Sequence, residues 1–256
     1  MSDSDLTDRI ALVTGASKGI GAVIARTLGA AGADVVAHYG SDRAGAQAAC
    51  AELPEDRRRL VQADLAAPGG ARALWREAVA WRGRVDVVVA NAAINLETPW
   101  DATDEDWDAA WDQTLRVNVR ATADLVREAV THFVPAGGGV LITLSSWAAL
   151  RGSALPQLSA YAASKAAVRA ITQTVAQNHA REGVLAYVVA PGLVSAGMSA
   201  AAIEQRGGAE AVNATMPLGE MVPPEEVAAL VAFLASGRCR HLTGATLDVN
   251  GASYVR

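Results

Sequence analysis

The stretch IALVTGASKGIG, residues 10–21, decides the fold of this chain. An apolar run, an expected strand over Ile10–Thr14, leads directly into a turn with three glycines, and a helical pattern follows over Ala22–Ala31. Glycine has no Cβ, so the backbone can turn sharply there and approach a ligand closely. The helix presents free N–H groups and the positive end of its dipole, which favour a phosphate. The GxxxGxG spacing is a variant of the dinucleotide fingerprint, and its place between a strand and a helix favours that role over an ordinary tight turn.

Strand and helix patterns alternate from this turn to the end of the chain. Short apolar runs predict six further strands, at Asp34–Ala37, Leu60–Ala63, Val85–Ala90, Val140–Leu144, Leu185–Ala190 and Thr246–Val249. Helical periodicity lies between them, at Gly70–Trp81, Trp107–Phe133, Ala162–Arg181 and Pro224–Ala235. Near-continuous apolar strands are typical of a parallel sheet with helices on both faces. The sequence therefore predicts an α/β fold, a doubly wound parallel sheet of about seven strands, in a single domain over residues 1–256. The longest stretch without a strand, Leu193–Val222, is predicted to be a substrate lid.

The composition argues against several classes of function. The chain has 256 residues and a net charge of -5 without long runs of either sign, whereas nucleic-acid and membrane-surface proteins cluster positive charge. Cys50, Cys239 and the four histidines are scattered without metal-ligand spacing, so no metal site is predicted. The polar N-terminus is unlike a signal peptide, and no apolar run reaches the ~18 residues of a membrane span. We expect a cytoplasmic protein with reduced thiols.

The second strand bears on which dinucleotide binds. An NAD site usually places an acid at the end of that strand for the ribose 2′-hydroxyl, and an NADP site prefers a cation. Here no acid ends the strand, and Asp42 comes later, followed at once by Arg43. Lys18, Ser41 and Arg43 could together hold a 2′-phosphate, so NADP(H) is favoured and NAD(H) stays open. The alternative is that Lys18 and Arg43 are solvated side chains.

A tyrosine and a lysine stand four positions apart in AYAASK, residues 160–165. On a helix Tyr161 and Lys165 lie on one face, one turn apart. A free phenol titrates near pH ~10, and a neighbouring ammonium together with a cationic nicotinamide would lower the pKa of Tyr161. The tyrosine could then exchange a hydroxyl proton while hydride moves to or from the nicotinamide. The alternative is an ordinary surface pair.

Other polar residues stand at strand ends or inside a helix. Ser145 and Ser146 end the fifth strand, Asn91 ends the fourth, and Asn118 lies within a helical pattern. Ligands of doubly wound sheets bind beyond the carboxyl ends of the strands, where a serine hydroxyl can hydrogen-bond a carbonyl oxygen. Asparagine is unfavourable inside a helix. Asn118 is therefore either a hydrated surface residue or a polar group with a purpose, and Ser146 is either functional or part of a turn.

Together these residues resemble the short-chain dehydrogenase/reductase family over nearly the whole chain, in particular its 3-oxoacyl-ACP reductases and carbonyl reductases. The matching motifs are TGASKGIG, Asp64-Leu65, Asn91-Ala92, Asn118, Ser145-Ser146, YAASK and Pro191-Gly192, in the order of the family. The resemblance implies a Rossmann fold and a catalytic tetrad of Asn118, Ser146, Tyr161 and Lys165. In this tetrad the tyrosine is the general acid/base, the lysine lowers its pKa and binds the nicotinamide ribose, the serine orients the substrate oxygen, and the asparagine holds a water.

The motifs also predict the residues that contact the dinucleotide. Asp64 is expected at the adenine, and Ile94 and Pro191 near the nicotinamide. The full predicted set is Gly15, Ser17, Lys18, Gly19, Ile20, Gly21, Tyr39, Ser41, Arg43, Asp64, Leu65, Asn91, Ala92, Tyr161, Lys165, Pro191, Gly192 and Val194.

The chain departs from the family pattern in four places, and none removes a tetrad member. The usual NNAG is ANAA here, so Ala93 adds a methyl group near the cofactor. The segment between Ser146 and Tyr161 is two residues longer than is usual in the family, which leaves Ser145 or Ser153 open as the catalytic serine. Ala196 stands where the family often has threonine, with Ser195 the nearest hydroxyl, and VNGA at residues 249–252 replaces VDGG.

We therefore expect an NAD(P)(H)-dependent oxidoreductase that interconverts a ketone and a secondary alcohol. The side chains expected at the substrate are small or apolar (Leu96, Trp147, Leu150, Leu155, Leu158, Met198, Ile203), and Arg151 could meet an anion. A sugar, a 3-oxoacyl thioester and a cyclic ketone stay open as substrates. The alternatives are a 3-oxoacyl thioester reductase, a lyase or isomerase on the same fold, and a non-catalytic NADP-sensing protein. Relatives pair their two long helices, so the resemblance implies a homo-oligomer, a dimer or tetramer, with no nucleic-acid or membrane partner.

Overall fold

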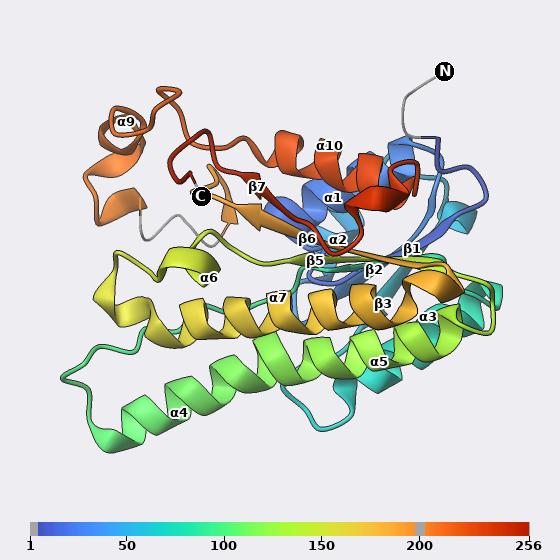
Figure 1. Cartoon of the computed structure of the whole chain (residues 1–256), viewed down its shortest axis with the longest axis horizontal. Helices are drawn as coiled ribbons and strands as arrows, with labels where there is room; N and C mark the ends of the chain where they lie inside the picture. Colours follow the sequence, from blue (N-terminus) through green and yellow to red (C-terminus); the bar gives the residue numbers. More distant parts are fainter. Residues whose placement is uncertain (1–4, 198–202, 256) are drawn as a thin grey trace.

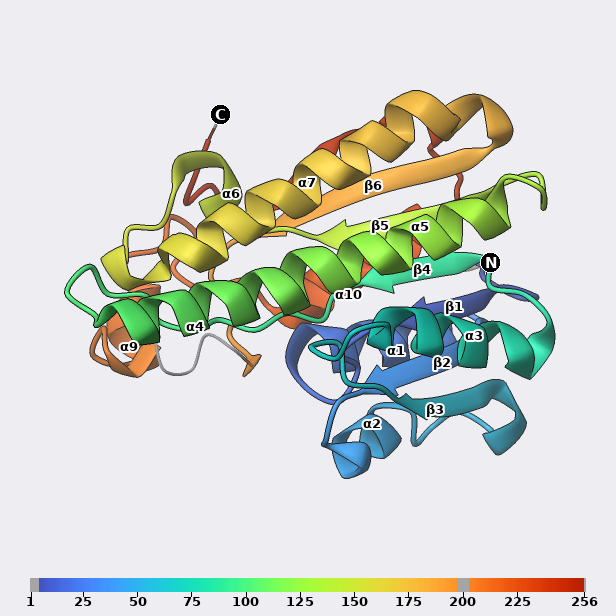
Figure 2. The same ribbon diagram turned by 90° about the horizontal axis from the view of Figure 1, so that it is seen from below.

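Seven parallel strands form one sheet in the computed structural model, which describes residues 5–197 and 203–255. The strand order is β3-β2-β1-β4-β5-β6-β7 (Figures 1 and 2). The chain winds outward from β1 to β3, then returns to start β4 on the other side of β1, which creates a switch point between β1 and β4. The predicted doubly wound sheet is confirmed, with all seven strands found where they were expected. The strands are β1 (Ile10–Val13), β2 (Asp34–Tyr39), β3 (Arg58–Gln62), β4 (Val87–Ala90), β5 (Gly139–Leu144), β6 (Val184–Pro191) and β7 (Thr246–Val249).

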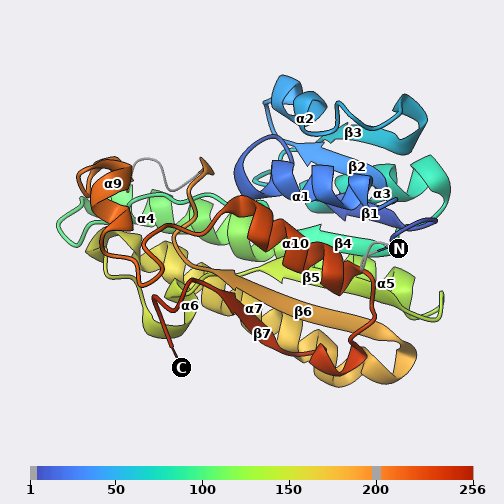
Figure 3. The same ribbon diagram turned by 90° about the horizontal axis from the view of Figure 1, so that it is seen from above.

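Helices cover both faces of the sheet. Helices α1 and α10 pack on one face, and α3, α5 and α7 pack on the other (Figures 2 and 3). Each face has its own apolar cluster, because successive side chains of a strand point to opposite sides of the sheet. The helices are α1 (Gly19–Ala30), α2 (Arg43–Ala49), α3 (Gly70–Arg82), α4 (Asp104–Thr114), α5 (Thr122–Phe133), α6 (Ala148–Arg151), α7 (Ser159–His179), α9 (Gly208–Asn213) and α10 (Pro224–Ala235), with short 3-10 turns between some of them.

The helix predicted over Trp107–Phe133 differs from expectation at its start and in its middle. It begins earlier, at Asp104, because Thr103 caps it by accepting a hydrogen bond of 3.2 Å from the Asp106 amide, and the first turn is acidic. Between α4 and α5 the backbone takes a π-helical path over Leu115–Ala121, and the three parts form one long rod. Helices α2, α6 and α9 were not predicted, since each is too short to show periodicity.

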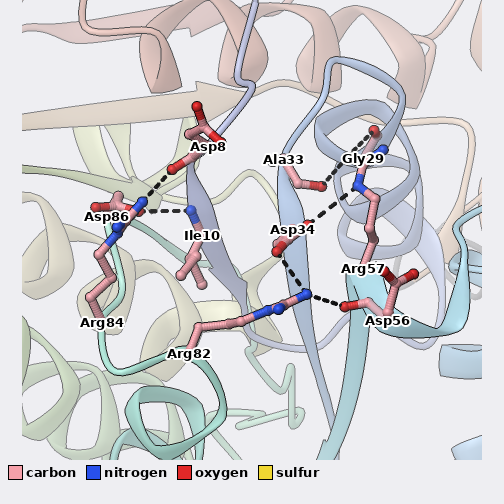
Figure 4. A network of polar contacts seen from close by, with 10 residues as sticks. All are labelled: Asp8, Ile10, Gly29, Ala33, Asp34, Asp56, Arg57, Arg82, Arg84 and Asp86. Atoms are coloured by element: carbon pink, nitrogen blue, oxygen red, sulfur yellow. Dashed lines mark hydrogen bonds and ion pairs between the residues drawn. The ribbon is translucent and has the colours of Figure 1, made fainter.

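A network of charged side chains pins the amino ends of the central strands (Figure 4). Asp34 accepts from Arg57 at 3.3 Å and from Arg82 at 3.2 Å. Asp86 accepts from the Ile10 amide at 2.8 Å. Ile10 and Asp34 are the first residues of β1 and β2, so this network holds the edge of the sheet opposite to the strand ends where a ligand would bind.

The segment between β6 and α10 projects beyond the carboxyl ends of the strands, where Figure 1 shows α9. It leaves the sheet after a bridge between Val194 and Val222 and builds a small apolar cluster of its own around Ile203, Val212 and Met221. Met198, expected at the substrate, lies outside the described residues. Among the described residues, no helix is both long enough and apolar enough to cross a bilayer.

Candidate active site

The glycine-rich turn closes the end of β1 against the end of β4. Gly15 and Gly19 have φ angles of +66° and +56°, which residues with a Cβ rarely adopt. A Cβ on Gly21 would lie only 2.1 Å from the Gly15 carbonyl oxygen. The Thr14 hydroxyl accepts hydrogen bonds of 3.0 Å from the amides of Asn91 and Ala92. The glycines and the hydrogen bonds from the residues after β4 therefore fix the backbone conformation of this turn.

The first helix opens on this turn without a side-chain cap. Lys18 occupies the N-cap position of α1 and makes no capping hydrogen bond. The first amides of this 12-residue helix are thus not satisfied by a side chain, and they adjoin the glycines that line the cleft. A helix start of this kind suits a pyrophosphate, so the local structure fits the dinucleotide that the motif predicts.

His38, which the sequence analysis did not assign, holds the turn from the side of β2. Its Nδ1 accepts a hydrogen bond of 3.0 Å from the Gly15 amide. Its Nε2 lies 3.1 Å from the Ala63 carbonyl oxygen, to which it can only donate, so the ring is neutral. Burial lowers the pKa of His38. The signal in the sequence was its position, at the strand end where a ribose-binding acid often stands.

Three of the predicted cofactor residues do not line the cleft. Arg43 donates a hydrogen bond of 3.0 Å to the hydroxyl of Tyr39, which is otherwise buried, and Ser41 is exposed. Asp42 caps α2 by accepting from the Gly45 amide at 2.8 Å, so this carboxylate is committed to the helix. Lys18 does line the cleft, beside the glycines of the turn.

Tyr161, Ser146 and Lys165 come together at the carboxyl ends of β5 and β6. The Ser146 side chain lies close enough to the Tyr161 hydroxyl to lower the pKa of the phenol. Lys165 is 5% exposed, and its Nζ lies 5.7 Å from the centre of the Tyr161 ring. This ammonium donates a hydrogen bond of 2.7 Å to the Leu144 carbonyl oxygen. The tyrosine and the lysine thus share one face of α7, as their spacing predicted.

Burial dominates the titration of this pair. It raises the pKa of Tyr161 to about 12, against a smaller opposing effect of the Ser146 side chain. It lowers the pKa of Lys165 to about 8. The expectation that a neighbouring ammonium lowers the pKa of the phenol is therefore not met in the protein alone, because loss of solvation outweighs it. At neutral pH the phenol keeps its proton and is poised as an acid.

The alternative serines have other partners. The Ser145 hydroxyl donates a hydrogen bond of 2.8 Å to the carbonyl oxygen of Lys165, and this bond connects β5 to α7. The Ser153 hydroxyl accepts from the Leu155 amide at 3.0 Å and stabilises its own turn. The segment with the two apparent extra residues carries α6 and this turn. Of the three serines, Ser146 is the one that acts on the pKa of the phenol.

Asn118 lies beneath the cleft rather than in its wall. It sits in the π-helical segment, and its Oδ1 accepts from the Ile94 amide while its Nδ2 donates to the Ile94 carbonyl, both at 2.8 Å. Nδ2 also donates a hydrogen bond of 3.0 Å to the Ser164 hydroxyl. That hydroxyl in turn donates a hydrogen bond of 2.7 Å to the Tyr161 carbonyl oxygen. Both amide hydrogens are thereby used. Asn118 links the loop after β4 to the backbone of the helix that carries the tyrosine.

One cleft of about 750 Å³ joins the glycine turn to the tyrosine. Its floor is the carboxyl edge of the sheet, and the segment after β6 forms its far wall. The predicted residues in its lining are Gly15, Ser17, Lys18, Gly19, Ile20, Gly21, Asp64, Leu65, Asn91, Ala92, Ser146, Tyr161, Lys165, Pro191, Gly192 and Val194. Trp147, Leu155 and Leu158, expected at the substrate, lie in the same lining, as do Leu96 and Arg151.

Comparisons with known proteins agree with this architecture. A family model described as enoyl-(acyl carrier protein) reductase matches residues 15–252. The chain is 35% identical over 256 residues to 3beta-hydroxysteroid dehydrogenase 1 of Eggerthella lenta, covering 96% of this chain and 94% of that protein. A solved structure from Beutenbergia cavernae, assigned as an NAD(P)-dependent gluconate 5-dehydrogenase with NADP bound at low occupancy, has a TM-score of 0.88 at 33% identity and covers 98% of each chain.

A second solved structure differs from the first in its bound cofactor and in the substrate for which it is named. The 3-ketoacyl-(acyl-carrier-protein) reductase from Brucella melitensis, complexed with NADH, has a TM-score of 0.86 at 26% identity. The match covers 98% of this chain and 100% of that one. The chain belongs to the short-chain dehydrogenase/reductase family, whose oxidoreductases interconvert ketones and secondary alcohols.

Proposed function

We propose that this protein reduces a ketone to a secondary alcohol with NADPH, and that Tyr161 donates the proton. The observation that carries the proposal is a protonated, partly buried phenol beside Ser146, in the same cleft as an uncapped glycine turn. A phosphate-binding turn without the phenol would indicate only a nucleotide-binding protein. The phenol without the turn would be an ordinary buried tyrosine.

The residues of the cleft divide the work of the reaction. When bound, the nicotinamide supplies the hydride that adds to the carbonyl carbon. Ser146 and Tyr161 both present hydroxyl groups to the carbonyl oxygen, which takes up the electron pair of the C=O bond. Tyr161 then gives its proton to that oxygen and completes the alcohol. Lys165, with Nζ on the Leu144 carbonyl, has further N–H groups for a ribose hydroxyl and stabilises the phenolate that remains.

The proposed preference for NADP(H) rests on charge at the adenosine end of the cleft. Asp42 is engaged as a helix cap, while Lys18 in the cleft wall carries a positive charge. Arg43 is held by Tyr39 at the end of β2. A 2′-phosphate is favoured beside cations without a competing acid. The relatives include one with NADP and one with NADH, so the family alone does not decide.

The apolar part of the cleft wall favours a second candidate, reduction of a 3-oxoacyl thioester. Leu96, Leu155, Leu158 and Leu193 line the cleft and would receive an acyl chain. The Brucella melitensis relative is named for such a substrate. The chemistry at Tyr161 would be the same, and only the group that enters the cleft would differ.

The test compares cofactor binding with turnover. Fluorescence titration should show NADPH binding to both the parent and Tyr161→Phe, while reduction across a panel of ketones is nearly abolished in the variant. Loss of NADPH binding in the parent would contradict the proposal. A Tyr161→Phe variant that turns over at the parental rate would assign the proton transfer to another group.

Further proposals concern the lid, assembly and location. We propose that residues 193–222 act as a lid, because Gly197 lies very close to the glycine turn. A Cβ on Gly19 would lie 3.3 Å from the Cα of Gly197.

We also propose a cytoplasmic homo-oligomer. Trp100 is 71% exposed and stacks on Trp107, with ring centres 5.4 Å apart, an apolar surface of the kind that subunit contacts cover. Light scattering of the purified protein and of Trp100→Glu tests the assembly.

A further inference from the structure

We propose that the cleft binds a small oxo acid, and that Arg151 recognises its carboxylate while the ketone lies at Tyr161. This inference deepens the proposed function and rests on it. It names the class of substrate, a ketone with a carboxylate several bonds from the reacting carbon.

Two aromatic rings hold the guanidinium of Arg151. Its central carbon lies 4.2 Å from the centre of the Trp147 ring and 5.8 Å from the centre of the Tyr254 ring. Trp147 directly follows Ser146. Tyr254 belongs to the C-terminal segment, where the side-chain amide of Asn250 donates a hydrogen bond of 2.9 Å to the Tyr254 carbonyl oxygen. Segments far apart in the sequence therefore place one cation at the wall of the cleft.

Contact with ring faces leaves the hydrogen-bonding edge of the guanidinium available. A guanidinium that stacks on a ring uses its flat face, while its N–H groups lie in its own plane. In the part of the chain that the structure describes, Arg151 forms neither an ion pair nor a hydrogen bond through its side chain. Its charge is thus held in position and lacks an acid partner. The fork of N–H groups can bind a planar carboxylate through two parallel hydrogen bonds.

The charges around the substrate end of the cleft favour an anion. Asp64 is the one acid in the described lining, and it lies after β3, at the adenosine end that the motifs predict. Arg206, also in the lining, adds a second cation on the segment opposite α6. The remaining wall is apolar, with Leu155 and Leu158 near α6. This combination suits a short hydrocarbon body with one negative charge, and a phosphate dianion would find few further donors here.

The position of Arg151 also sets the spacing of the two groups. It ends α6, which begins two residues after Ser146, whose hydroxyl accepts a hydrogen bond of 3.2 Å from the Ala148 amide. At about 1.5 Å per residue, the rise of α6 from Ala148 to Arg151 is about 4.5 Å. Arg151 and Tyr161 stand on different helices, α6 and α7, so we infer that the carboxylate and the ketone are separate groups of the substrate. The spacing indicates a carboxylate separated from the ketone by several bonds or by a ring.

The experiment measures NADPH-dependent reduction of matched acids and esters. The probes are methyl ketones with two, three and four methylene groups before a carboxylate, a ring ketone with a carboxylate, and the methyl ester of each. The parent enzyme should reduce the best acid with a kcat/KM at least about tenfold above that of its ester, the value of one charged hydrogen bond. Arg151→Gln should remove this preference, mainly through KM, because the arginine holds the substrate before and during the reaction alike.

Two controls separate binding from folding. Arg127→Gln changes the net charge equally but lies exposed on α5, so it should keep the preference for acids. The esters serve as internal controls, and Arg151→Gln should change their kcat/KM far less than that of the acids. Equal rates for acids and esters in the parent, or equal losses for both in Arg151→Gln, would overturn the inference. A parent that binds NADPH and reduces only thioesters or neutral ketones would overturn it while leaving the proposed reduction intact. Failure of NADPH binding and of every ketone would instead reject the proposed function itself.

Discussion

Lys165 donates its buried hydrogen bond of 2.7 Å to the carbonyl oxygen of Leu144, the last residue of β5. The strand ladder leaves this carbonyl oxygen at the edge of the sheet, and the lysine satisfies it. The ammonium is thus held by the backbone of β5, and its Nζ faces the ring of Tyr161. The position of the ammonium is set by the fold before any ligand binds, which is the arrangement that a catalytic group requires.

The buried lysine should leave a signature in the pH dependence of stability. Its pKa in the folded protein is about 8, below the ordinary value of 10.5. Between these values the unfolded chain holds a proton that the folded protein has lost, so the free energy of unfolding rises with pH. Relative to Lys165→Met, the parent should gain about 2 kcal/mol between pH 7.5 and 10. Urea denaturation of both proteins across this range measures the difference. A constant difference would show that the lysine is solvated.

The raised pKa of Tyr161 predicts different pH profiles for the two directions of reaction. With a pKa near 12, the phenol is protonated throughout the neutral range, and reduction needs the protonated form. Oxidation of the alcohol needs the phenolate, whose fraction rises about tenfold per pH unit below the pKa. We expect kcat for oxidation to climb from pH 7 to 9.5, while kcat for reduction does not rise. Steady-state rates with saturating cofactor measure both, and a flat profile for oxidation would exclude the phenol as the base.

The sequence was sufficient for the sheet because its strands are short, apolar and bounded by turns. The glycine turn and the YAASK motif also pointed to the carboxyl ends of the strands, where the structure has its cleft. The π-helical turn at Asn118 could not be predicted, because it depends on the pairing of that amide with Ile94 in a distant loop. The stacking of Arg151 on Trp147 and Tyr254 likewise requires the C-terminal segment to fold back.

Titration was the property that sequence described least well. From the spacing of Tyr161 and Lys165 the expected effect was attraction between charges, which lowers the pKa of a phenol. Burial in the folded protein outweighs this attraction and raises the pKa of the phenol instead. Burial is a tertiary property, and no local pattern in YAASK reports it.

His38 should make cofactor binding and stability sensitive to acid. Its pKa in the folded protein lies below 6.5, so at higher pH the ring is neutral in both the folded and unfolded states. As the pH falls through 6.5 the unfolded chain takes up a proton first, and the free energy of unfolding decreases. His38→Gln should show a smaller fall in Tm between pH 7.5 and 5. His241→Gln, at an exposed position, is the matched control and should behave as the parent. A parental acid slope in His38→Gln would remove the histidine from this role.

The amide of Asn118 predicts the effect of a nearly isosteric substitution. In Asn118→Asp the carboxylate could still accept from the Ile94 amide, but nothing would donate to the Ile94 carbonyl or to Ser164. Each buried group left without a partner costs about 1–3 kcal/mol, so we expect a loss of roughly 3 kcal/mol in the free energy of unfolding. Asn178→Asp, an exposed change on α7, should cost less than about 0.5 kcal/mol. Because Ser164 bonds to the Tyr161 carbonyl, the Asn118 variant should also lose kcat while the folded fraction still binds NADPH. If Asn118→Asp were as stable and as active as Asn178→Asp, the π-helical turn would not be what positions the tyrosine.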